Sequence, residues 1–309
     1  MKSLINQSII LTILLGSALS FAQQPNYPTQ AESAELHYSD LKNFVIAFKA
    51  LEQSTDTILT LNTLYFDKAS IGLKEYINRH GLTPMILKDA IKKNREKYSK
   101  IETFIDGLDE LKPELLELFE KFQNIVPDTM FAPTYLLVGA NRGIAQASQY
   151  GQLITITRIL EKKDRLLQLI IHELAHFQQA KTLGGPQYVA LYSQPNNLLG
   201  ICLREGGAEF ITNQICGKIT QEKSITYFDK NESDLKNGFL KDIKEQGSSF
   251  WLWESNEKKE HPLGLGYVMG YKIWNQYYSL VEDREQVIRE ILSLSDADQY
   301  IEKSGYFVE

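Results

Sequence analysis

The stretch LIIHELAHFQQA, residues 169–180, places two histidines four residues apart inside an apolar run. On an α-helix, residues i and i+4 lie on the same face, so His172 and His176 would point in one direction. The leucine, isoleucine and phenylalanine side chains around them favour burial of this helix, and buried imidazoles need polar partners. The pattern therefore predicts a helix over residues 162–181 whose two histidines share a ligand.

A metal ion is the ligand that this spacing indicates. Imidazole nitrogens one helical turn apart can meet a single zinc ion, and Glu173 stands beside them, where a carboxylate can reach a zinc-bound water. The alternative is a pair of surface histidines next to an acid, but the apolar neighbours argue against an exposed face. We expect His172 and His176 to be zinc ligands and Zn²⁺ to be the cofactor.

A catalytic zinc site needs a third protein ligand and leaves one position open for water. The segment LREGGAEFI, residues 203–211, offers Glu205 and Glu209 at helical spacing. Gly206 and Gly207 reduce helix propensity, a cost that is tolerable if this helix must approach the histidine helix closely. The alternative is a solvated acidic helix face, because acids at this spacing are common.

These two segments resemble the gluzincins, zinc peptidases with two histidines and one glutamate as ligands. HELAH at residues 172–176 matches their first motif, and EGGAE at residues 205–209 is similar to the NEGFA segment of the zinc aminopeptidases. The resemblance implies that Glu205 is the third ligand and that Glu209 orients a ligand histidine. It covers about residues 134–278, which also look like predicted secreted zinc-dependent proteases of bacteria.

The resemblance also concerns the group that stabilises the oxyanion. The aminopeptidases carry a Y-x-K-G segment whose tyrosine has this role, and this chain has Tyr267-Val-Met-Gly270, without the lysine. Tyr267 is the first candidate, Tyr271 the second, and His261 an alternative similar to the thermolysin-like donor. An aromatic helix face that simply belongs to the core is the other interpretation of the tyrosines.

The expected substrate is a peptide or protein. The aminopeptidases bind the substrate amine through the glutamate of a G-A-M-E-N segment, whereas the corresponding VGANRGIAQAS, residues 138–148, has no acid. This departure favours an endopeptidase over an aminopeptidase. The predicted strand GQLITIT, residues 151–157, could pair with an extended substrate at the sheet edge.

The rival function is a zincin-fold binding protein without catalysis. A structural zinc site would more often have a fourth protein ligand, and Cys202, one helical turn before Glu205, could supply it. The retained Glu173 favours the enzyme, because a structural site does not use a proton carrier. Cys202 and Cys216 would be about 20 Å apart on one helix, too far for a disulfide.

Composition and charge restrict the partners. The chain has 309 residues, a net charge of -6 and 43% apolar residues, which is typical of a globular protein with a full core. No basic run is present, so we expect neither a nucleic-acid partner nor an anionic membrane surface. The oligomeric state is not predicted.

The first residues have the order of a secretory signal peptide. Lys2 precedes an apolar stretch from Ile9 to Leu19, and Ser20-Phe21-Ala22 has small residues at its first and third positions. The apolar run is short for a membrane span, although a buried N-terminal helix is an alternative. We expect cleavage near Ala22 and an exported protein, periplasmic or extracellular, without a stable membrane anchor.

The remaining chain predicts an α+β fold that is mostly α. Residues 23–126 read as a helical N-terminal region, with Asp40 as a helix cap, Gly81 as a helix end, and Thr83-Pro84 as a helix start. Two strand-like runs, residues 134–140 and 151–159, then precede the histidine helix across a loop. Further helices are expected over residues 198–217, 220–247, 264–281 and 283–292. We expect residues 127–309 to form a zincin-like domain with a small sheet beside the HExxH helix.

Overall fold

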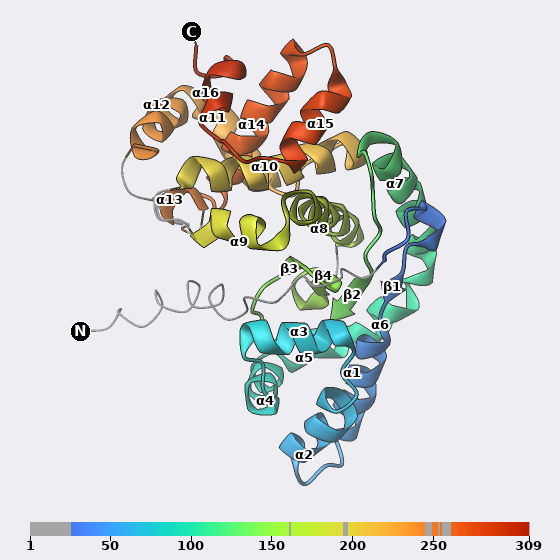
Figure 1. Cartoon of the computed structure of the whole chain (residues 1–309). Coiled ribbons are helices and arrows are strands. Elements are labelled where there is room, and N and C mark those ends of the chain that lie inside the picture. The colour runs from blue at the N-terminus through green and yellow to red at the C-terminus, as the bar shows by residue number, and fades with distance from the viewer. Residues whose placement is uncertain are drawn as a thin grey trace, which may run out of the picture. The chain divides into compact units, whose positions relative to one another are not determined.

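The fold is α+β and mostly helical, with one small mixed sheet (Figure 1). The computed structural model describes residues 26–160, 162–193, 197–244, 249–252, 254 and 261–308. The predicted signal peptide, residues 1–22, lies outside these ranges. Two compact units can be distinguished: one comprises Met1–Glu120 and Met130–Phe177, the other Lys121–Thr129 and Gln178–Glu309. The predicted division into residues 23–126 and 127–309 stays a prediction.

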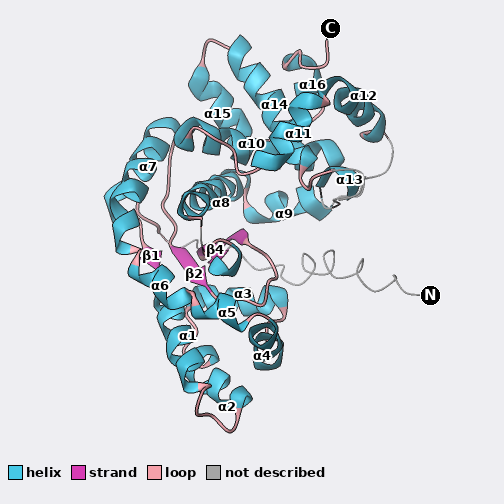
Figure 2. Ribbon diagram, turned by 180° about the vertical axis from the view of Figure 1, so that it is seen from behind, coloured by secondary structure: helices cyan, strands magenta, loops and turns pink. Residues whose placement is uncertain are grey.

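The first unit contains short helices and the sheet (Figure 2). Its helices are α1 (Ser39–Ala50), α2 (Thr57–Leu61), α3 (Ile71–His80), α4 (Pro84–Lys93), α5 (Arg95–Ser99) and α6 (Ile101–Asp106). Single helical turns are η2 (Ala31–Ser33), η3 (Asn62–Phe66), η4 (Asp109–Leu111) and η5 (Ile156–Arg158). Helices α7 (Lys112–Ile125) and α8 (Lys163–Leu183) each begin in the first unit and end in the second.

Turn and cap residues explain several helix ends of the first unit. Gly81 ends α3 in the left-handed conformation, with φ of 57°, and the Thr83 hydroxyl accepts a hydrogen bond from the Ile86 amide at the start of α4. Both features confirm the sequence prediction. The predicted cap at Asp40 is wrong. This carboxylate lies inside α1 and accepts hydrogen bonds from the Ser70 amide and hydroxyl, at 3.0 and 2.5 Å, so it joins α1 to the start of α3.

The sheet has four strands in the order β1-β2-β4-β3. The strands are β1 (Leu36–His37), β2 (Thr134–Leu137), β3 (Ala145–Ser148) and β4 (Gly151–Thr155). β1 and β4 pair with β2 in parallel, whereas β3 pairs with β4 antiparallel. The predicted loop between the two strand-like runs therefore contains a strand. Because β4 has a neighbour on each side, the expected pairing of residues 151–157 with a substrate strand is wrong.

Both central strands are buried. Every residue of β2 and β4 is buried, as expected for strands covered on both faces. Helix α3 packs so closely that a Cβ built on Gly72 would lie 2.3 Å from the Tyr135 ring of β2. Along the chain, β4 is followed by η5 and then by α8, the histidine helix.

Among its described residues, the second unit has helices joined by loops and no strand. Besides the ends of α7 and α8 it contains α9 (Gly185–Ser193), α10 (Leu198–Cys216), α11 (Glu222–Lys230), α12 (Glu232–Asp242), α13 (Ser249–Leu252), α14 (Leu265–Leu280), α15 (Arg284–Leu292) and α16 (Gln299–Lys303). The predicted helices 198–217, 264–281 and 283–292 are confirmed, but residues 220–247 include two helices separated at Asn231. Among the described residues, no helix is long and apolar enough to cross a membrane.

The centre of the second unit is the contact between α10 and α14, and small residues permit it. A Cβ built on Gly270 would lie 1.8 Å from the Cys202 carbonyl oxygen, and one on Gly206 would lie 2.1 Å from the Gly270 carbonyl carbon. Gly206 and Gly207 were expected to let α10 approach the histidine helix, but the near neighbour of Gly206 is α14. A Cβ built on Gly207 would lie 2.7 Å from the Ile291 side chain of α15 and close to the side chains of Trp274 and of Gln179, which lies on the histidine helix α8.

Candidate metal centre

The two histidines lie where the apolar run predicted them, inside α8 and buried. The Nε2 atoms of His172 and His176 are 3.1 Å apart, and the ring planes are inclined by 82°. Nearly all of the helix around them is buried, which agrees with its apolar residues on every side. The two rings therefore direct one nitrogen each toward a common point.

Glu205 completes the cluster. It lies on α10, and the ligand atoms of His172, His176 and Glu205 are all within 4.8 Å of one another. All three residues are buried, with 5–6% of their surface exposed. α8 is continuous across the boundary between the two units, and in the second unit its Gln179 side chain donates a hydrogen bond to the Arg204 carbonyl of α10. The predicted ligand set is brought together.

The donor set fits a transition-metal ion. Two nitrogens that bind a tetrahedral zinc at about 2.0–2.1 Å are about 3.3 Å apart, close to the 3.1 Å between the two Nε2 atoms. Two imidazoles and one carboxylate form a ligand set that zinc-dependent hydrolases use, with a fourth position left for water. Among the described residues, no other histidine, cysteine, aspartate or glutamate joins the cluster.

Tyr192 is a site residue that the sequence analysis missed. Its hydroxyl donates a hydrogen bond of 2.7 Å to Glu205 Oε1. Burial, and then the charge of Glu205, raise the pKa of Tyr192 well above its usual value, so the hydroxyl keeps its proton and remains a donor. The bond restricts the orientation of the Glu205 carboxylate.

Helix α9, which carries Tyr192, is held against α10 by Arg204. The guanidinium carbon lies 4.3 Å from the centre of the Tyr188 ring and 5.4 Å from that of Tyr192, while Nη1 donates to the Tyr188 carbonyl at 2.6 Å. Arg204 is only 1% exposed, so these cation–π contacts are shielded from water. Pro186 near the start of α9 was the signal that could have revealed this helix, since proline is common in a first helical turn.

The two other acidic residues of the prediction have different surroundings. Glu173 follows His172 on α8 and is buried, and it is not part of the three-residue cluster. Glu209 is fully buried on α10, and its carboxylate accepts hydrogen bonds from the Thr220 amide, at 2.6 Å, and from the Thr220 hydroxyl. These bonds tie the turn after α10 back to the helix. The predicted effect of Glu209 on a histidine stays a prediction.

The three candidates for oxyanion stabilisation all belong to the second unit. Tyr267 and Tyr271 lie on α14 and are partly buried, and the backbone amide of Tyr271 borders Gly206, next to Glu205. Burial raises the pKa of Tyr271, with Glu209 among the charges that contribute. His261 is buried, with its ring 4.0 Å from the Phe250 ring. The assignment of the role to one of them stays a prediction.

Cys202 was considered as a fourth ligand. Its sulfur faces α14, where a Cβ built on Gly266 would lie 2.6 Å away. Burial, and then the charge of Glu205, raise the pKa of the Cys202 thiol well above its usual value. A metal-binding cysteine needs the thiolate form, so this environment favours a buried thiol. Both cysteines lie on α10.

Comparisons with known proteins add no relative: no protein-family model, no curated protein and no solved structure matches this chain.

Proposed function

We propose that the protein is an exported zinc-dependent peptidase that hydrolyses internal peptide bonds. The observation that carries this proposal is the buried convergence of His172, His176 and Glu205. The Glu173 carboxylate beside the first histidine supports catalysis over a purely structural site, and the resemblance of residues 172–176 and 205–209 to the gluzincin motifs supports peptide bonds as the target.

Each residue of the site has its own role in the proposed hydrolysis. A zinc ion held by the three ligands would lower the pKa of a water molecule to about 7 and polarise the scissile carbonyl. Glu173 takes the proton from the attacking water and passes it to the leaving amine. Tyr192 holds the Glu205 carboxylate in a fixed orientation through its hydrogen bond. Tyr267, Tyr271 or His261 donates a hydrogen bond to the oxyanion of the tetrahedral intermediate.

Metal content and cleavage together test the proposal. The purified mature chain is assayed for bound metals by mass spectrometry and for cleavage of a broad peptide library, whose products are sequenced. We expect one zinc per chain and cleavage inside the peptides. The variant Glu173→Gln should retain zinc and lose activity by at least about a hundredfold, because general acid–base catalysis contributes that much.

The matched control is Glu114→Gln, which changes an exposed glutamate on α7 in the same way. It should match the parent in both measurements. A parent chain that binds zinc and is stabilised by it, but cleaves none of the peptides, would favour the zincin-fold binding protein. A parent chain without bound metal after purification and zinc reconstitution would refute the site itself.

A further inference from the structure

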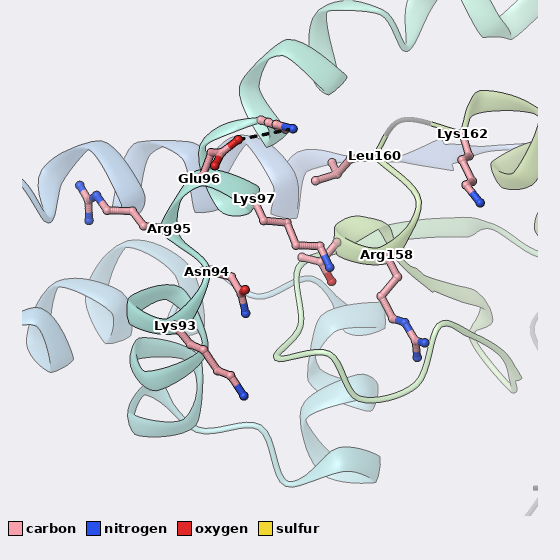
Figure 3. Close-up of a pocket in the computed structure, with 10 residues that line it drawn as sticks. Lys93, Asn94, Arg95, Glu96, Lys97, Arg158, Leu160 and Lys162 are labelled. Atoms are coloured by element: carbon pink, nitrogen blue, oxygen red, sulfur yellow. Dashed lines mark ion pairs between the residues drawn. The ribbon is translucent and has the colours of Figure 1, made fainter. Parts of the chain in front are cut away.

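The first unit has a second candidate binding site, a cavity lined mainly by lysine and arginine residues (Figure 3). None of its lining residues belongs to the metal cluster. It measures about 460 Å³ and is formed by the region of α4 and α5 together with the segment that follows β4. The residues lining it are Lys93, Asn94, Arg95, Glu96, Lys97, Lys100, Thr157, Arg158, Leu160 and Lys162. Six of these ten are cationic and one is acidic, in a chain whose net charge is -6.

Two of the six cations are already compensated. Arg95 points away from the cavity in Figure 3, lies over the Phe48 ring at 4.8 Å and forms an ion pair with Glu52 at 3.5 Å. Lys100 pairs with Glu96, the one acidic residue of the lining, at 3.8 Å. In the described part of the chain, no acid forms an ion pair with any of the other four: Lys93, Lys97, Arg158 and Lys162.

Lys97 and Arg158 are close enough to disturb each other. The Lys97 side chain extends toward Arg158 in Figure 3. Burial, and then the charge of Arg158, lower the pKa of Lys97. Its ammonium donates a long hydrogen bond of 3.4 Å to the Asn141 side-chain oxygen. An anion placed between the two cations would offset their repulsion.

A hydroxyl group completes the lining. Thr157 Oγ1 is buried, has no hydrogen-bond partner among the described residues, and belongs to a residue that is 0% exposed. A buried hydroxyl without a partner is costly and needs an explanation. An anionic oxygen in the cavity would accept this hydrogen bond, together with those of the neighbouring lysine and arginine.

We propose that this cavity binds a small molecule with two neighbouring phosphate groups, a diphosphate or a bisphosphate. Among the described residues, four lining cations have no acidic partner, and their charge exceeds that of a single phosphate dianion. Lysine and arginine, with a hydroxyl donor, are the side chains that suit phosphate oxygens. The limited volume of the cavity and the acidic chain as a whole favour a small ligand over an extended polyanion such as a nucleic acid.

Calorimetric titration with inorganic pyrophosphate tests the proposal. The full mature chain is first treated with a chelator, so that pyrophosphate cannot bind through a metal ion. We expect saturable binding of one pyrophosphate per chain, tighter than that of inorganic phosphate. The double variant K97Q/R158Q should bind at least about tenfold more weakly, because two charge-assisted hydrogen bonds are lost.

The control K68Q/K74Q also removes two positive charges from the first unit, at exposed positions outside the cavity. It should stay within about twofold of the parent, so that a general effect of net charge is separated from a site. The variant Thr157→Val keeps the shape and removes the hydroxyl, and we expect it to weaken binding severalfold while the melting temperature of the ligand-free chain stays the same or rises.

Three results would overturn the proposal. The first is that pyrophosphate does not bind the parent. The second is that K68Q/K74Q weakens pyrophosphate binding as much as K97Q/R158Q does. The third is that a single-stranded oligonucleotide binds more tightly than pyrophosphate and that K97Q/R158Q weakens its binding too. If pyrophosphate does not bind in this titration, the peptidase proposal is unaffected. The titration is done without metal, and the substituted residues are not part of the metal-ligand cluster.

Discussion

The Tyr192 hydroxyl of α9 donates a hydrogen bond of 2.7 Å to Oε1 of Glu205 on α10. A residue of one helix therefore orients a proposed metal ligand on the next. A carboxylate that rotates freely must lose this freedom on binding a metal, whereas one that is already held does not. Partners of this kind are worth about tenfold to a hundredfold in metal affinity in other metal sites.

The first prediction concerns this hydrogen bond. Tyr192→Phe keeps the ring beside Arg204 and removes the donor, so we expect zinc affinity to fall by about tenfold, measured by competition with a chromogenic chelator. Tyr278→Phe, whose ring contacts Phe210 and Arg284, is the control and should leave the affinity unchanged. Equal affinities of parent and Tyr192→Phe would show that the hydrogen bond does not prepare the ligand.

The second prediction concerns the contact of α10 with α14. Gly270→Ala places a methyl group 1.8 Å from the Cys202 carbonyl oxygen, which forces the two helices apart. We expect a loss of about 3 kcal/mol or more in the free energy of unfolding, measured by urea titration. Gly238→Ala on α12 is the control. Its Cβ would meet only the Trp251 ring, at 3.9 Å, so it should stabilise the chain slightly by favouring the helix.

The sequence predicted α8 and α10 because each depends on its own residues. The apolar side chains around the two histidines in residues 166–177 require burial, and the spacing of His172 and His176 follows from helix geometry. Glu205 was proposed from its resemblance to known ligands, and the structure places it in the cluster.

Other features could not be found this way because they depend on tertiary neighbours. The Tyr192–Glu205 bond joins two helices, and no spacing rule connects them. Gly206 was expected to allow a close approach to the histidine helix, but the sequence does not reveal that Gly270 of α14 packs against Gly206. The strand β3 has only four residues, of which Ala145, Gln146 and Ala147 have little strand propensity, and its pairing with β4 alone defines it.

The third prediction uses His80, which is buried in the first unit. Its ring bonds the Gln146 side chain at 3.1 Å, and burial, followed by the charges of Arg79 and Arg142, lowers its pKa below the usual 6.5. The unfolded chain therefore takes up this proton at a higher pH than the folded chain does. The resulting stability is present above pH 6.5 and is lost as the pH falls below that value.

The variant His80→Gln should reduce this dependence. Urea titrations at pH 7.5 and pH 5.5 give the loss in the free energy of unfolding for parent and variant, and we expect a smaller loss in the variant. The variant is also expected to be less stable at pH 7.5, because Gly143 and Tyr76 pack closely on the imidazole. The same loss in both chains would mean that other groups cause the acid sensitivity.

The last prediction concerns removal of the metal. Because the ligands come from α8 and α10, a bound ion crosslinks the two helices and stabilises only the folded chain. At a free zinc concentration a hundredfold above the dissociation constant, this linkage contributes about 2.7 kcal/mol, which corresponds to a melting temperature several degrees higher. Chelator should lower the melting temperature of the zinc-loaded parent by that amount and leave His176→Gln unchanged, since that variant lacks one ligand. If chelator lowers both melting temperatures equally, the stabilising ion is bound elsewhere, because the two chains differ only at the proposed ligand.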